Sequence, residues 1–160
     1  MEEVRRIRAR YVFPAAGRPI VEGTLAIRGD RIVGVGSRSG QTGVENLGNV
    51  AILPGFVNAH THLDFSGVKR PLGEPGIRLP DWIGQVIAWR NRQSDFRGVV
   101  GQGLAESIRL GTTTLGEIAQ ADWPVEVFEH SRTKSIVFLE LIAPTQDRVE
   151  PAMGRAQRHV

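Results

Sequence analysis

An apolar run at residues 50–59 ends in two histidines, His60 and His62, which are one residue apart. A nearly continuous apolar run of this length is typical of a strand that is buried on both faces in a parallel sheet. Side chains along a strand alternate between its two faces, so His60 and His62 point the same way. Two imidazoles on one face at the end of a strand can bind one metal ion. This stretch therefore predicts a parallel α/β fold with a candidate metal site at a strand end.

The segments after residue 50 alternate between strand and helix patterns. The helical stretches repeat apolar side chains at helical spacing, and Gly111 is a typical C-cap for the second of them. Strands that alternate with helices predict βαβ units and a parallel sheet. The predicted elements are a helix at 80–90, a helix at 96–110, a strand at 112–118, a short helix at 124–133, a strand at 135–142 and a helix at 151–160.

The first 50 residues have a different character, with short strands and turns. Residues 4–13 read as a strand of mixed polarity. Two apolar runs, at 24–28 and 31–35, flank Gly29 and Asp30, which is a strong hairpin signal. Residues 36–48 are rich in Gly, Ser and Asn and predict a loop. This part of the chain is therefore predicted to be a small all-β unit.

The composition limits the chemistry that the chain can perform. It contains no cysteine, so a metal must be held by His, Asp, Glu or a modified Lys. No segment approaches the ~18 apolar residues of a membrane span, and the N-terminus has no apolar signal core. The net charge is +3, but the arginines are dispersed among acidic residues, which disfavours a nucleic-acid partner. A cytoplasmic protein without a membrane partner is expected.

Residues 54–62, Pro-Gly-Phe-Val-Asn-Ala-His-Thr-His, resemble the first barrel strand of the amidohydrolase superfamily. Residues 29–32 resemble part of the small β-sandwich that accompanies this barrel, and residues 111–114 resemble its second strand. The resemblance implies an α/β fold: about the first three βα units of a partial (β/α)₈ TIM-type barrel, preceded by a β-sandwich segment. The domains implied are a β-sandwich segment at 1–52 and the N-terminal part of the barrel at 53–160. The chain looks like an N-terminal fragment of a longer enzyme.

Within the superfamily, Asn-Ala-His-Thr-His-Leu resembles the cytosine, guanine and adenosine-type deaminases and the chlorotriazine hydrolases. This resemblance implies that His60 and His62 bind one divalent metal ion, Zn²⁺ or Fe²⁺. It also implies hydrolysis of a carbon–nitrogen bond in a small heterocyclic substrate by metal-bound hydroxide. The general base and the remaining ligands are expected on later strands, so the 160-residue chain alone is expected to be inactive. A homo-oligomer is a further expectation.

Two alternatives stay open on the sequence. A cyclic amidase or N-acyl amidohydrolase would need a carboxylated lysine, and neither Lys69 nor Lys134 is positioned for that role. Leu63 and Asp64 follow the second histidine where the cyclic-amide branch usually has an arginine. The other alternative is a non-catalytic protein that is truncated or depends on assembly with a partner.

Several other side chains are candidates for the site or for packing. Asp64, Trp82 and Glu117 are candidates for the substrate pocket. A structural ion pair is the favoured interpretation for Glu117 and for Glu140. Core packing is favoured for Trp82 and Trp89, which lie on one helix face because they are seven residues apart. The residues predicted to be solvated or outside the site are Arg90, Arg92, His130 and His159.

Overall fold

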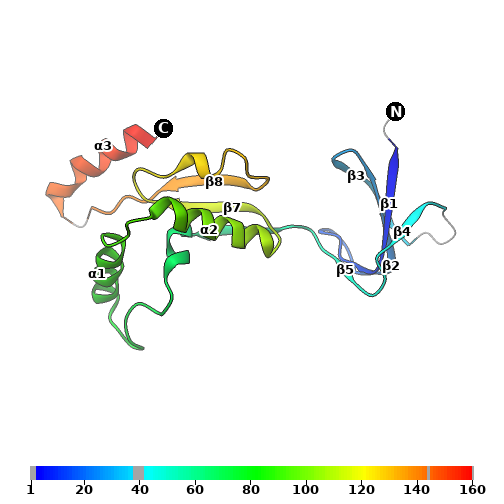
Figure 1. Cartoon of the computed structure of the whole chain (residues 1–160), viewed down its shortest axis with the longest axis horizontal. Coiled ribbons are helices and arrows are strands. Elements are labelled where there is room, and N and C mark those ends of the chain that lie inside the picture. Colours follow the sequence, from blue (N-terminus) through cyan, green and yellow to red (C-terminus); the bar gives the residue numbers. More distant parts are fainter. Residues whose placement is uncertain (1–2, 38–41, 144, 160) are drawn as a thin grey trace. The chain divides into compact units, whose positions relative to one another are not determined.

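The computed structural model describes residues 3–37, 42–143 and 145–159. The chain divides into two compact units, Met1–Pro54 and Gly55–Val160. In Figure 1 the first unit runs from blue to cyan and the second from green to red.

The first unit is built around one five-stranded sheet. Its three long strands are β1 (Val4–Val12), β2 (Ile20–Arg28) and β3 (Arg31–Gly36), which pair antiparallel in the order β3-β2-β1. Gly29 adopts a φ of 58° between β2 and β3, which confirms the predicted hairpin and explains the glycine there. The described residues of this unit form one sheet, so the β-sandwich remains a prediction.

Two short strands complete this sheet and correct the sequence-based boundaries. β4 (Val44–Asn46) and β5 (Ala51–Ile52) both pair in parallel with β1. The prediction of an uninterrupted loop at 36–48 is therefore wrong at β4; residues 38–41 of that range lie outside the described residues. The apolar run at 50–59 is likewise not one strand. It is interrupted around Pro54, which has no N–H to donate to a neighbouring strand, so β5 ends before this residue and the next strand begins after it.

The second unit contains a three-stranded parallel sheet. Its strands, in spatial order, are β6 (Phe56–Thr61), β7 (Thr112–Ala119) and β8 (Lys134–Leu139). The helices are α1 (Leu79–Arg90), α2 (Phe96–Arg109) and α3 (Val149–His159), as seen in Figure 1. The predicted parallel α/β organisation of this part is confirmed, although Val160 and the side chain of His159 lie outside the described residues.

Helix α2 contributes Val100 and Leu104 to the core that supports the sheet. Asp95 caps its N-terminus, with a carboxylate oxygen that accepts from the Gly98 N–H at 2.8 Å. The C-cap is Leu110, and Gly111 directly after it has a φ of 90°, so the predicted glycine ends the helix one position past the cap. The buried core residues of this unit are Leu63, Val100, Leu104, Leu115, Ala119 and Trp123. This core fixes the segment immediately after His62 against α2 and β7.

The strand that carries the histidines is less buried than its apolar sequence predicts. Among the described residues, β6 pairs only with β7 and lies at an edge of the sheet. Phe56 and Val57 are 55% and 67% exposed. The prediction of burial on both faces is wrong here, because an apolar strand is buried only where other layers cover it.

The segment at 124–133 also differs from its prediction. It contains a single 3₁₀ turn, η2 (Val125–Val127), in place of a short helix. The aromatic ring of Phe128, just after this turn, packs on Trp123 with ring centroids 5.7 Å apart. Tertiary contacts of this kind outweigh the weak propensity of a short segment.

Candidate metal centre

His60 lies at the carboxyl end of β6, and His62 directly follows the strand as the N-cap of η1 (Leu63–Gly67). Their ring centroids are 5.3 Å apart, with an angle of 68° between the ring planes. His60 is exposed and His62 is half-buried. The two imidazoles therefore lie together at the end of the parallel sheet where the active sites of β/α barrels form.

The carboxylate of Glu117 fixes the backbone just after the histidines. Its Oε1 and Oε2 atoms accept from the N–H of Leu63 at 3.0 and 3.2 Å, and Glu117 is completely buried in β7. Burial raises the pKa of Glu117 from 4.5 to about 7; the Leu63 N–H and Arg90 oppose this rise, and Asp64 adds to it. The predicted structural ion pair of Glu117 is wrong, because its partner is a backbone N–H group.

Arg90, in the last turn of α1, lies among three side chains from other elements. Its Nε donates to Asp64 Oδ2 at 2.7 Å, and its Nη1 donates to Glu140 Oε2 at 3.0 Å. Its Nη2 lies 3.3 Å from His62 Nδ1. The Arg90 side chain is only 13% exposed, so the prediction of a solvated Arg90 is wrong.

The sequence carried one signal for the burial of Arg90. Arg90 follows Ile83 and Val86 at helical spacing, on the stripe of α1 whose member Val86 is buried. An arginine on an apolar stripe can bury its stem and guanidinium only when acidic partners meet it. The sequence did not reveal that Asp64 and Glu140 would be those partners.

The two carboxylates that pair with Arg90 differ in their burial and in their other hydrogen-bond partners. Asp64 is 1% exposed, and its Oδ1 has no hydrogen-bond partner among the described residues. Glu140, directly after β8, also accepts from Gln120 Nε2 at 2.6 Å. The predicted ion pair of Glu140 is confirmed by its contact with Arg90. Asp64 lies in a buried ion pair beside the histidines.

Aromatic rings form one side of this cluster. The Arg90 guanidinium lies 4.7 Å from the centroid of the Phe65 ring, and Phe65 also contacts the rings of His62 and Trp89 at 5.3 and 5.7 Å. Trp89 therefore packs on Phe65, but it is half-buried and lies outside the buried core, so the prediction of core packing is not borne out for it. Trp82 is half-buried on α1, and its role in a substrate pocket remains a prediction.

The donor set fits a divalent metal in part. Imidazole nitrogen suits both Zn²⁺ and Fe²⁺, and a catalytic zinc site takes about three protein ligands. Within residues 3–37, 42–143 and 145–159, no group of three or more His, Asp or Glu side chains is placed to hold a metal ion. His60 and His62 are two side chains of the expected kind, and their role as metal ligands remains a prediction. His130 is exposed and follows η2.

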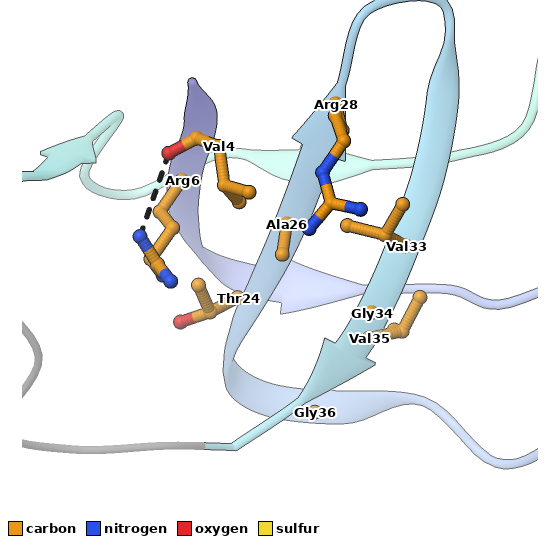
Figure 2. Close-up of a pocket in the computed structure, with 9 residues that line it drawn as sticks. All are labelled: Val4, Arg6, Thr24, Ala26, Arg28, Val33, Gly34, Val35 and Gly36. Carbon is orange, nitrogen blue, oxygen red and sulfur yellow. Dashed lines mark hydrogen bonds between the residues drawn. The ribbon is translucent and has the colours of Figure 1, made fainter. Parts of the chain in front are cut away.

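A cavity of about 300 Å³ lies elsewhere, on the sheet of the first unit (Figure 2). Val4 pairs with Arg28 and Arg6 pairs with Ala26, so these four side chains share one sheet face. Nine residues line the cavity, and none of them carries a carboxylate or an imidazole. This cavity therefore offers neither metal ligands nor a general base.

No protein-family model matches the chain. The chain is 34% identical to an imidazolonepropionase of Streptomyces griseus, over 59% of this chain and 27% of that protein. It is also 34% identical to an aminodeoxyfutalosine deaminase of Nitratiruptor, over 62% of this chain and 24% of the relative. Its fold is similar to that of Helicobacter pylori aminofutalosine deaminase, with a TM-score of 0.75, 19% identity and coverage of 96% of this chain and 40% of that one.

The parallel sheet with its flanking helices gives the chain an α/β fold, and the relatives that it resembles are enzymes. The relatives and structural neighbours that it resembles are members of the amidohydrolase superfamily. The chain spans about a quarter of the length of the curated relatives that it matches. None of the helices that the structure describes has the length and apolar character that crossing a bilayer requires.

Proposed function

We propose that this chain is the first part of a metal-dependent hydrolase that acts on carbon–nitrogen bonds other than peptide bonds. The reaction that we favour is hydrolytic deamination of a purine-, pyrimidine- or triazine-like ring. The observation that carries the proposal is the pair His60 and His62 at the carboxyl end of β6, in a chain related to proteins named as deaminases. A cytoplasmic location and assembly into a homo-oligomer remain predictions.

We infer the domain organisation from the same relationship. Residues 1–52 would belong to a β-sandwich, and residues 53–160 would form about the first three βα units of a (β/α)₈ barrel. In such a barrel, the carboxyl ends of β6, β7 and β8 would all face the active site. Gln120 and Glu140, which follow β7 and β8, meet there at 2.6 Å. This hydrogen bond supports the proposal that the residues following β7 and β8 line the same active site.

In the proposed site, some residues would bind the metal ion and others would orient those ligands. His60 and His62 would hold Zn²⁺ or Fe²⁺, and the bound metal would supply a water nucleophile of lowered pKa. Glu117 would orient the histidines through the Leu63 N–H, and Asp64 would act through Arg90. Further ligands and a general base would come from outside the described residues.

The alternative of a cyclic amidase with a carboxylated lysine has less support. Lys134 begins β8, at the amino end of the strand, whereas His60 and His62 lie at the carboxyl end of β6 in the same parallel sheet. Lys69 is exposed in the segment after η1 (Leu63–Gly67). Neither lysine is placed beside the two histidines.

The test uses purified protein that contains this chain within its full polypeptide. His60→Ala and His62→Ala should each lose bound metal and the release of ammonia from a panel of aminopurines, aminopyrimidines and aminotriazines. His130→Ala is the matched control, because His130 is exposed and follows η2, and it should retain both properties. Full metal content and activity in either β6 variant would refute the proposal. A wild-type protein without metal or ammonia release would favour the non-catalytic alternative.

A further inference from the structure

Two glycines of β3 open the cavity on the sheet of the first unit (Figure 2). Gly34 pairs with Ala26 and Gly36 pairs with Thr24, so both glycines share the face of these β2 residues but add no side chain to it. A Cβ at Gly36 would meet nothing within 4 Å, and a Cβ at Gly34 would meet only that of Ala26, at 3.6 Å. The space left open, about 300 Å³, is at the lower end of the range for small-molecule pockets.

Two arginines line this cavity and give it positive charge. They are Arg6 on β1 and Arg28 at the end of β2, and Figure 2 shows the Arg28 side chain extending toward Ala26 and Val33. Within the described part of the chain, neither guanidinium has an acidic partner. Arg6 Nη1 makes one long hydrogen bond, 3.4 Å, to the carbonyl oxygen of Val4. Because a guanidinium has donors and no acceptor, both arginines can take a ligand that supplies acceptors.

A buried hydroxyl group also lines the cavity. Thr24 is 7% exposed, and its Oγ1 atom has no hydrogen-bond partner among the residues that the structure describes. In Figure 2 this oxygen lies on the side of the Arg6 guanidinium. Arg8 is opposite Thr24 in the register of β1 and β2, and its buried Nε lacks a partner in the same sense, while its Nη2 pairs with Glu22. Buried polar atoms are normally satisfied, so an acceptor bound here would remove a cost.

The lining suits an anion that also has an apolar part. A guanidinium matches the paired oxygen atoms of a carboxylate or a phosphate group, with two N–H donors in parallel. Val4, Val33 and Val35 contribute apolar surface to the same cavity. The nine described residues that line it include no acidic side chain that would repel an anion. A flat surface of solvated arginines would lack both the enclosed space and the buried hydroxyl.

We propose that this cavity is a binding site for a small organic anion. The carboxylate or phosphate group of the ligand meets the guanidinium groups of Arg6 and Arg28 and the hydroxyl of Thr24. The apolar part of the ligand lies on Val33 and Val35. The site lies wholly in the first unit and is independent of the proposed metal centre.

Calorimetric titration of the full-length protein with benzoate, phenyl phosphate and benzyl alcohol tests the class of ligand. The three probes share one aromatic ring and differ in the group attached to it. We expect saturable binding of at least one anion and none of the neutral alcohol. Tighter binding of benzoate would assign the site to carboxylates, and tighter binding of phenyl phosphate would assign it to phosphate esters. Binding of neither anion, or equal binding of benzyl alcohol, would overturn the proposal.

Arg28→Gln tests whether the bound anion lies in the cavity. It should weaken binding of the preferred anion about tenfold or more, because it removes a charge-assisted hydrogen bond. Arg5→Gln is the matched control: it removes the same charge from the opposite face of β1, where Arg5 pairs with Glu45, and it should bind as the wild type does. Equal losses in the two variants would show an effect of net charge alone and overturn the site.

Gly36→Val tests the space itself, because it fills the cavity and leaves every charge in place. The backbone of Gly36 is not in the left-handed region, a Cβ there meets open space, and valine suits a strand. The variant should therefore melt at or above the wild-type temperature and bind the anion at least tenfold more weakly. Wild-type affinity in Gly36→Val would overturn the proposal. If this variant does not fold, the comparison of Arg28→Gln with Arg5→Gln decides.

Discussion

The buried carboxyl of Glu117 should make the stability of the metal-free protein depend on pH. Its carboxyl is completely buried, and it accepts twice from the Leu63 N–H. The perturbation that isolates the charge is Glu117→Gln, because an amide oxygen can still accept from the same N–H while it cannot ionise. Glu117→Leu has a similar size and removes both the charge and the acceptor.

The magnitude follows from the pKa of Glu117. A rise from 4.5 in the unfolded chain to about 7 in the folded protein corresponds to about 3 kcal/mol. Because the folded state binds this proton more tightly, the contribution to stability is fully present below pH 4.5 and is lost as the pH rises through about 7. The free energy of unfolding of Glu117→Gln, minus that of the wild type, should therefore increase by about 3 kcal/mol from about pH 4.5 to pH 8.

The assay is chemical denaturation of the full-length protein in the presence of a chelator, at several pH values between these limits. Glu117→Leu should follow the same pH trend as Glu117→Gln. It should also be less stable than Glu117→Gln by about 1–3 kcal/mol at every pH, because the Leu63 N–H is left without a partner. A difference between wild type and Glu117→Gln that is constant with pH, or that changes in the opposite direction, would refute this reasoning.

Three further predictions concern the packing around the site. Asp64→Asn should lower the free energy of unfolding by about 3 kcal/mol in denaturation experiments, because it removes the charge that compensates buried Arg90. A loss below about 1 kcal/mol would contradict this expectation. Gly116→Ala should lower both the melting temperature and the metal content, because a Cβ at this position would collide with the carbonyl oxygen of Ala59 on β6. An unchanged melting temperature would count against the close approach of β6 to β7. Leu104→Ala should cost about 2–5 kcal/mol by denaturation, because this side chain is 4% exposed in the core, and a cost typical of a surface site would show that α2 packs differently.

Much of the local structure could be predicted because its causes are local. The hairpin around Gly29 needs only a short turn between two strands, and α2 needs only an apolar stripe between Asp95 and Gly111. The meeting of His60 and His62 follows from the alternation of side chains on a strand. These features would hold for any fold that contains the same segments.

The failed predictions involve burial or pairing with distant parts of the chain. The apolar character of Phe56 and Val57 indicated burial on both faces, but burial depends on covering layers that the described residues do not supply. The strand β4 pairs with β1 across a long separation in sequence, so the polar composition of 36–48 could not reveal it.

The sequence by itself determined which residues can serve as metal ligands and that two of them share one end of a parallel strand, because strand geometry repeats every two residues. Only the tertiary structure decided which charges surround them. Arg90 lies 28 residues from His62, 26 from Asp64 and 50 from Glu140, and Glu117 lies 54 from Leu63. Nothing in local periodicity distinguishes these partners from other charged residues of the chain. They meet because the Arg90 side chain, in the last turn of α1, reaches residues that follow β6 and β8, where burial makes each unpaired charge costly.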